Sequence, residues 1–221
     1  MNVLVIGASR GIGLEFVRQY REAGAAVTAT ARDDESLARL NALGATAIRL
    51  DVAEAASASG LARQIEGADF DVAIVNAGVS GVRGDGLSTP TEADFDRVMH
   101  VNVLGPMRVI PQIVEALAPQ GKVVALSSRM GSIGSRTAAG SSLYRASKAA
   151  LNSLLKDASL AHAGRAVCVA FHPGWVRTDM GGPGADIDAA TSVAGMRKVI
   201  AGLRERDNGG FFDHAGQAIP W

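Results

Sequence analysis

The chain opens with Met1-Asn2-Val3-Leu4-Val5-Ile6-Gly7-Ala8-Ser9-Arg10-Gly11-Ile12-Gly13, an apolar run that passes directly into a glycine-rich turn. The run 1–6 is short and rich in branched apolar residues, which predicts a buried strand. Helical periodicity follows in Leu14-Glu15-Phe16-Val17-Arg18-Gln19-Tyr20, and Gly24 is placed to end that helix. The three glycines are therefore predicted to lie between a strand and a helix.

A turn of this kind is suited to binding a phosphate group. Gly7 permits a sharp turn out of the strand, Gly11 lets a pyrophosphate approach the backbone, and Gly13 lets the helix pack close to the strand. The helix N-terminus adds free N–H groups and the positive end of the helix dipole. We therefore predict that this turn, which includes Ser9 and Ile12, binds a nucleotide; a glycine-rich turn without a ligand is the alternative.

Patterns typical of strands and helices alternate along the rest of the chain. We predict strands at 26–31, 47–50, 70–75, 122–126, 166–171 and 210–212, and helices at 33–43, 54–65, 91–103, 106–117, 143–163 and 188–206. Strands that alternate with helices indicate right-handed crossovers and a parallel sheet, and no shift in composition marks a second domain. The stretches 79–90 and 173–185 are predicted to be loops.

The composition excludes several classes of protein. The 221 residues carry 22 Lys and Arg against 22 Asp and Glu, so the net charge is zero and provides no field to hold a nucleic acid. Apolar residues make up 48 % of the chain, yet no apolar run approaches the roughly 20 residues that cross a membrane. The single cysteine, Cys168, cannot form an internal disulfide, which favours a reducing, cytoplasmic location.

Three further motifs follow predicted strands or lie on the longest predicted helix. Asn76-Ala77-Gly78 follows the fourth strand, Ser127-Ser128-Arg129-Met130-Gly131 follows the fifth, and Tyr144-Arg145-Ala146-Ser147-Lys148 lies on the helix 143–163. With the opening glycines, these motifs resemble the short-chain dehydrogenase/reductases over essentially the whole chain, and the local sequence is similar to the C-factor and Sniffer-type carbonyl reductase branch. The resemblance implies one Rossmann domain over 1–221, an α/β fold with a doubly wound parallel sheet. The sheet is expected to have about seven strands in the order 3-2-1-4-5-6-7, with a small substrate loop at about 175–188.

The resemblance assigns the chemistry to four side chains. Tyr144 and Lys148 are four residues apart on one predicted helix, so they share a face, and the ammonium favours the tyrosinate. Tyr144 is thereby suited to act as general acid or base, and Ser128, which leads an S-x-x-G pattern, is suited to bind the substrate carbonyl. Asn102 is implied to hold a water that connects Lys148 to solvent; an asparagine at a helix kink is the alternative.

The same resemblance implies a nicotinamide dinucleotide at the carboxyl ends of the strands. Asp51 and Val52 are expected to contact its adenine, although a helix N-cap is an alternative role for Asp51. The residues expected near its riboses and nicotinamide are Asn76, Ala77, Gly78, Tyr144, Lys148, Pro173, Gly174, Val176 and Thr178.

The end of the second predicted strand favours NADP(H) over NAD(H). An NAD-specific site has a carboxylate there to hold the ribose 2′-hydroxyl, and this chain has Ala31. Arg32 follows, and Arg10 lies inside the glycine-rich turn, so two guanidiniums are available for a 2′-phosphate. Asp33 and Asp34 favour the opposite preference, but we expect them to cap the next helix.

Two functions are consistent with these residues. The first is an NADPH-dependent carbonyl reductase, or the reverse alcohol dehydrogenase, that acts on a small molecule. The second is a nucleotide-binding signalling protein of the same fold, in which turnover is secondary. No metal site is expected, because the 4 histidines lack the spacing of metal ligands. Family members are usually dimers or tetramers, so the resemblance implies a homodimer or homotetramer.

The substrate pocket is predicted to contain Val79, Met130, Ser132, Trp175 and Met180.

Overall fold

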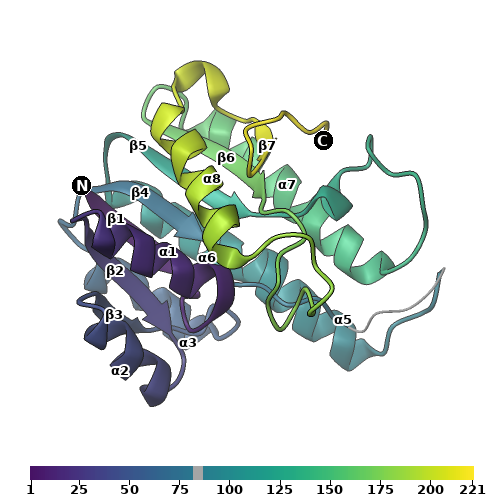
Figure 1. Cartoon of the computed structure of the whole chain (residues 1–221), viewed down its shortest axis with the longest axis horizontal. Coiled ribbons are helices and arrows are strands. Elements are labelled where there is room, and N and C mark those ends of the chain that lie inside the picture. The colour runs from purple at the N-terminus through teal and green to yellow at the C-terminus, as the bar shows by residue number, and fades with distance from the viewer. Residues whose placement is uncertain (82–86) are drawn as a thin grey trace.

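A parallel sheet forms the centre of the protein. The structure is a computed structural model that describes residues 1–81 and 87–221, so residues 82–86 of the predicted loop lie outside the described residues. The strands are β1 (Asn2–Ile6), β2 (Ala26–Ala31), β3 (Thr46–Arg49), β4 (Phe70–Val75), β5 (Leu117–Leu126), β6 (Ala166–His172) and β7 (Phe211–Asp213). They form one 7-stranded sheet in the order β3-β2-β1-β4-β5-β6-β7, with parallel neighbours throughout (Figure 1). The structure confirms the predicted α/β fold and strand order.

Helices cover both faces of this sheet. They are α1 (Gly11–Glu22), α2 (Asp34–Ala42), α3 (Ala55–Ser59), α4 (Leu61–Gln64), α5 (Glu92–Met99), α6 (Gly105–Glu115), α7 (Ser142–Ala161) and α8 (Ala189–Gly202), with the short helical turns η1 (His100–Leu104), η2 (Arg129–Gly131) and η3 (Glu205–Asp207). Figure 1 shows α1 and α8 together in front of the sheet, where Phe16 and Met196 belong to one buried core. Leu61 of α4 and Leu155 of α7 belong to the core on the opposite face. Over the described ranges, no helix is both long and apolar enough to span a membrane.

The strand order reverses direction between β1 and β4, so the crossovers diverge there and a crevice opens at the carboxyl ends of the strands. Asn76 Nδ2 donates to the Gly7 carbonyl oxygen at 2.6 Å, which joins the end of β4 to the end of β1. The Gly7 N–H donates to Thr30 Oγ1 at 2.9 Å and so connects β2 to the same turn. These two bonds hold the glycine-rich turn in place at the crevice.

Two predicted helices are interrupted or end early. The predicted helix 54–65 is divided into α3 and α4 at Gly60, because a glycine costs backbone entropy inside a helix. The predicted helix 188–206 ends at Gly202, since Leu203 adopts an extended conformation and buries its side chain in the core. Glycine and tertiary burial therefore override the helical periodicity at these positions.

One predicted strand is longer in the structure, and two predicted helices are joined. β5 begins at Leu117 rather than at residue 122, with an irregular register against β4 near its start. Gln120 has a φ of 62° in this stretch, a left-handed conformation that is uncommon for residues other than glycine. The predicted helices 91–103 and 106–117 are continuous through η1, which is a π-helical turn. Such turns inside helices are often found at functional sites.

Replacing Gly13 by Ala tests the close packing between α1 and the end of β1. A Cβ at this position would lie 2.2 Å from the Gly7 carbonyl oxygen and 2.6 Å from Asn76 Nδ2. We expect Gly13→Ala to lower the free energy of unfolding by about 1–3 kcal/mol or more, the range for overpacked sites, as measured by denaturant unfolding. The control is Gly202→Ala at the end of α8, where a Cβ meets no described atom within 4 Å. Equal stability of the two variants would contradict this account.

Candidate active site

A cavity of about 350 Å³ lies at the carboxyl ends of the strands, within the range of ligand-binding pockets. The predicted residues that line it are Gly7, Ser9, Arg10, Gly11, Ile12, Arg32, Asp51, Val52, Asn76, Ala77, Gly78, Val79, Tyr144, Lys148, Pro173, Thr178 and Met180. Ala31, where an NAD-specific site has its carboxylate, also lines it. Sequence reasoning missed the other lining residues, which are Thr30, Leu50, Val101, Leu126, Ser127, Arg177 and Asp179. The structure therefore brings motifs from distant parts of the chain to one crevice.

The glycine-rich turn forms one wall of the cavity. Gly7 and Gly11 have φ values of 83° and 55°, in the left-handed region that favours glycine. A Cβ on Gly11 would lie 3.3 Å from Thr178 Cγ2, so the segment that follows β6 reaches this turn. The residues 173–188, which we call the β6 segment, thereby form the opposite wall.

Lys148 and Tyr144 project into the cavity from successive turns of α7. Lys148 is only 4 % exposed, and its Nζ donates to the Leu126 carbonyl oxygen at 2.8 Å. Burial lowers the pKa of Lys148 to about 8, because an ammonium loses hydration there. Its Nζ lies 5.9 Å from the centre of the half-buried Tyr144 ring. A lysine in this state carries its positive charge at neutral pH close to the phenol.

The two serines after β5 have different surroundings. Ser127 is buried, and its hydroxyl donates to Asn152 Oδ1. Ser128 is 8 % exposed, and its Oγ accepts a bond from the Met130 N–H at 3.1 Å. A Cβ on Gly131 would lie 2.8 Å from the backbone of Lys148, so this loop packs directly on α7. The S-x-x-G loop therefore packs on the helix that carries Tyr144 and Lys148, while Ser128 itself is not among the described residues that line the cavity.

Asn102 lies in η1, is fully buried and acts as a clamp on the chain after β4. Its Nδ2 donates to the Val79 carbonyl oxygen at 2.8 Å and to Ser147 Oγ at 3.0 Å. Its Oδ1 accepts from the Val79 N–H at 2.8 Å. Because both amide protons are occupied, this side chain positions Val79 against α7. The predicted proton relay through Asn102 stays a prediction.

The β6 segment is folded on itself. Gly174 has a φ of 89° and a Cβ there would lie 2.8 Å from Ile187 Cδ1, so glycine suits this bend. Val176 pairs with Ile187 in an isolated bridge, and Trp175 Nε1 donates to the Gly181 carbonyl oxygen at 2.9 Å. Gly174, Trp175 and Val176 thus shape the segment, while Thr178 and Met180 line the cavity.

The structure does not place Ser132 in the substrate pocket, where the sequence predicts it. Ser132 is fully buried and its hydroxyl donates to the Pro220 carbonyl oxygen. The Gly134 N–H donates to the Trp221 carbonyl oxygen at 3.0 Å, and the Trp221 ring stacks on Phe211 at 5.4 Å. The residues 219–221 therefore anchor the loop that follows Ser128, a contact that local sequence patterns do not reveal. Met130, from the same predicted pocket, is half-buried.

Both arginines proposed for a phosphate face a carboxylate of the same cavity. Arg10 Nη1 lies 2.7 Å from Asp179 Oδ2, and Arg32 Nη1 lies 3.6 Å from Asp51 Oδ2. The acidic pair after β2 has other partners, as expected for residues at a helix start. Asp33 accepts from the Ser36 N–H at 2.8 Å as the N-cap of α2, and Asp34 pairs with Arg49.

Arg39 is a further cation beside this end of the cavity that sequence reasoning missed. Its Nη1 donates to the Ser9 carbonyl oxygen at 3.0 Å, and its Nη2 pairs with Glu35 at 2.7 Å. Arg39 and Ser9 are 30 residues apart in the sequence, so no local pattern indicates this contact, which forms because α2 packs beside the glycine-rich turn.

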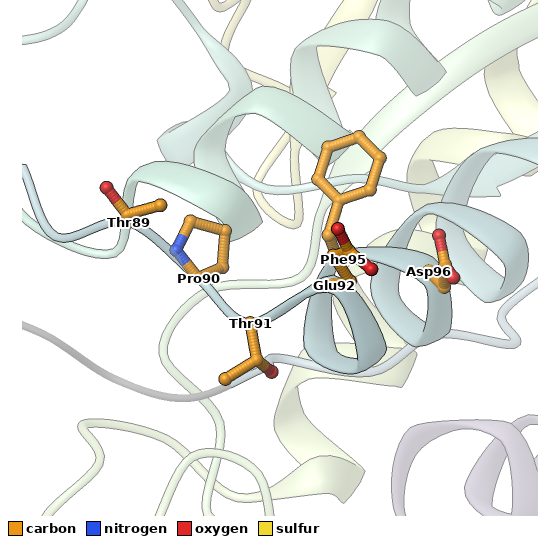
Figure 2. Close-up of a pocket in the computed structure, with 6 residues that line it drawn as sticks. All are labelled: Thr89, Pro90, Thr91, Glu92, Phe95 and Asp96. Atoms are coloured by element: carbon orange, nitrogen blue, oxygen red, sulfur yellow. The ribbon is translucent and has the colours of Figure 1, made fainter.

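A second, shallower hollow of about 270 Å³ lies at the start of α5 (Figure 2). Its lining residues are Thr89, Pro90, Thr91, Glu92, Phe95 and Asp96, which are all outside the predicted site. Thr91 uses its side chain to cap α5 by accepting from the Asp94 N–H at 3.1 Å. Among the residues that the structure describes, there is no cluster of three or more side chains that could hold a metal ion.

Replacing Lys148 by Met tests the cost of the buried ammonium. Because burial lowers the pKa of Lys148 from 10.5 to about 8, the unfolded chain holds this proton more tightly between those pH values. Wild-type stability therefore rises with pH in that window. Below pH 8 the burial penalty is on the order of 3 kcal/mol, reduced by the bond to Leu126, so we expect Lys148→Met to be more stable there. This advantage should shrink between pH 8 and 10.5 in denaturant titrations.

Lys156→Met is the matched control, because Lys156 is exposed on the same helix. Its effect on the free energy of unfolding should not change across that pH window. A Lys148→Met effect that is equally independent of pH would contradict the burial account.

Comparisons with known proteins agree with this geometry. A family model described as short chain dehydrogenase matches residues 1–186. The C-signal protein of Myxococcus xanthus is 46% identical over 156 residues, which is 68% of this chain and 92% of that protein. A short-chain dehydrogenase/reductase from Burkholderia multivorans with bound NADP superposes with a TM-score of 0.93 at 31% identity, covering 100% of this chain and 99% of that one. The carbonyl reductase Sniffer of D. melanogaster gives 0.91 at 27% identity with the same coverage. The chain therefore belongs to the short-chain dehydrogenase/reductase family of oxidoreductases, in the branch that resembles C-factor and Sniffer.

Proposed function

We propose that the protein is an NADP(H)-dependent carbonyl reductase that transfers hydride between the cofactor and a carbonyl or secondary alcohol. The observation that carries this proposal is the buried Lys148 beside Tyr144, at a cavity whose opposite end is the glycine-rich turn. A perturbed lysine next to a phenol in a crevice is typical of a catalytic site. The relative with bound NADP supports the choice of cofactor.

The cavity fits a dinucleotide. The glycine-rich turn has no side chain at Gly7, Gly11 or Gly13, and α1 begins at Gly11, so its free N–H groups are available to a pyrophosphate. When bound, the cofactor supplies the hydride. The residues that would hold it are Ser9, Arg10, Ile12, Arg32, Asp51, Val52, Asn76, Ala77, Gly78, Lys148, Pro173 and Thr178.

The chain's own residues supply the proton and hold the substrate. Tyr144 donates its phenolic proton to the carbonyl oxygen during reduction, and Lys148 stabilises the resulting tyrosinate by its charge. Ser128 Oγ already accepts a bond from the Met130 N–H, so its own proton is free to be donated to the same carbonyl oxygen. Two donors thereby converge on the oxygen that gains negative charge.

The substrate end of the cavity is partly apolar. Met180, which is 40 % exposed, and Val79, which follows β4, both line the cavity. Trp175, on the same β6 segment as Met180, is 50 % exposed and adds an aromatic surface. We therefore favour small, partly apolar ketones, aldehydes or quinones, and a screen of these compounds with NADPH oxidation as the readout selects among them.

A signalling role is the second candidate, favoured by the 46% identity to the C-signal protein. In that case nucleotide occupancy of the same cavity carries the function and turnover is secondary. The two candidates differ in what they require of Tyr144, since binding a nucleotide does not need its proton.

Replacing Tyr144 by Phe removes the proposed proton donor with little change in shape. We expect kcat/KM for carbonyl reduction to fall by about 10²–10⁴-fold, the usual contribution of general acid catalysis, while NADPH binding persists. The other tyrosine, Tyr20, lies in the core on α1, so Tyr20→Phe should retain activity. Undiminished turnover by Tyr144→Phe would rule out the proposed mechanism. If Tyr144→Phe lost turnover yet restored the phenotype of a strain lacking the gene, the signalling role would be favoured.

Replacing Arg32 by Ala tests the choice of NADP(H). An exposed charge-assisted contact to phosphate is worth roughly 1–2 kcal/mol, so the Kd for NADPH should rise by about tenfold while the Kd for NADH changes little. Fluorescence titration measures both values. Arg63→Ala, on the exposed side of α4, serves as the control. An Arg32→Ala protein with the NADPH affinity of the wild type would refute the assignment.

A further inference from the structure

The β6 segment meets the glycine-rich turn at two consecutive residues. Thr178 lies against Gly11, and the Asp179 carboxylate lies 2.7 Å from Arg10 Nη1. Arg10 and Asp179 both line the cavity, and their side chains are 74% and 73% exposed. The ion pair therefore bridges the two walls of the cavity at a place that solvent and ligands can reach.

The position of Asp179 matters because of what Arg10 is proposed to bind. A ribose 2′-phosphate carries close to two negative charges, and Asp179 adds a third in contact with the same guanidinium. Asp179 also accepts from Nη1 of Arg10, a donor that a phosphate would otherwise accept from. A dinucleotide without the 2′-phosphate has no such group to compete with Asp179 for Arg10. The pyrophosphate is common to both cofactors, so its repulsion from Asp179 does not discriminate between them.

Asp51, the second acidic residue that lines the cavity within the described part of the chain, is held differently. Its Oδ1 accepts from the Ala53 N–H at 2.9 Å, and its side chain is 26% exposed. Its pair with Arg32, at 3.6 Å, is longer than the pair between Arg10 and Asp179. Asp179 is thus the carboxylate that can be altered with the least disturbance of the fold.

We propose that Asp179 is a specificity-determining residue that limits the preference for NADP(H) over NAD(H). A 2′-phosphate must draw Arg10 away from Asp179, whereas NAD(H) leaves the ion pair intact. This inference rests on the proposed function, because it assumes that Arg10 contacts the 2′-phosphate. With Asp179 present, the ratio of the Kd for NADH to the Kd for NADPH should be smaller than Arg10 and Arg32 would give without this carboxylate.

The experiment compares Asp179→Asn with the wild type in titrations of NADPH and NADH. Asn keeps the size of the side chain and removes its charge. We expect the Kd for NADPH to fall by about two- to fivefold, the range of exposed ion pairs, and the Kd for NADH to stay unchanged. The gain should shrink as salt is raised, because the charges are exposed. An unchanged or weaker NADPH affinity, or an equal gain for NADH, would overturn the inference.

Asp186→Asn is the matched control, since Asp186 is an exposed carboxylate of the same segment whose backbone oxygen accepts from Arg177. An equal gain in this variant would assign the effect to overall charge and overturn the role of Asp179. In an Arg10→Ala background, most of the Asp179→Asn gain should disappear. If Arg10→Ala weakens NADPH binding and Asp179→Asn does not strengthen it, this inference alone fails. If neither Arg10→Ala nor Arg32→Ala weakens NADPH binding, the proposed cofactor preference fails with it.

Discussion

The hydrogen bond from Asn76 Nδ2 to the Gly7 carbonyl oxygen is the contact on which the rest of the site depends. It joins β1 and β4 where the crossovers diverge, and α1 packs over it because Gly13 has no side chain. The same Gly7 oxygen would meet any Cβ at residue 13. The glycine-rich turn and the chain after β4 are therefore held at a fixed position relative to each other, and both line the cavity.

Burial of the Lys148 ammonium lowers the free energy of unfolding, but it also brings the pKa of this lysine closer to neutral. Its ammonium is buried against the Leu126 carbonyl oxygen, and the loop at Gly131 packs on its backbone. The pKa of about 8 leaves the lysine charged at neutral pH, yet close enough to its transition for its charge to respond to a neighbour. Active sites often combine such local strain with stability supplied elsewhere, here by the two cores that flank the sheet.

The sequence predicted the parts of the fold that local patterns encode. Short apolar runs predicted the strands and a parallel sheet, and the resemblance to the family predicted their order. The spacing of Tyr144 and Lys148 placed both on one helix face, at the cavity. Residues whose partners are far away in the chain were out of reach. Ser132 is held by a residue 88 positions away, and Arg10 pairs with one 169 positions away. Neither contact leaves a local periodicity, so a pocket residue was misplaced and Asp179 was missed.

The β6 segment has internal hydrogen bonds that bear on how a bound molecule leaves. The Arg177 N–H donates to the Ile187 carbonyl oxygen at 2.8 Å, and the Ile187 N–H donates to the Trp175 carbonyl oxygen at 3.2 Å. A segment closed on itself in this way can swing as one body, because its backbone groups stay paired when it moves. Such a movement would break the contacts of Thr178 and Asp179 with the glycine-rich turn and leave the hydrogen bonds inside the segment intact. The residence time of a bound molecule would then depend on these two contacts, separately from the contacts that set its affinity.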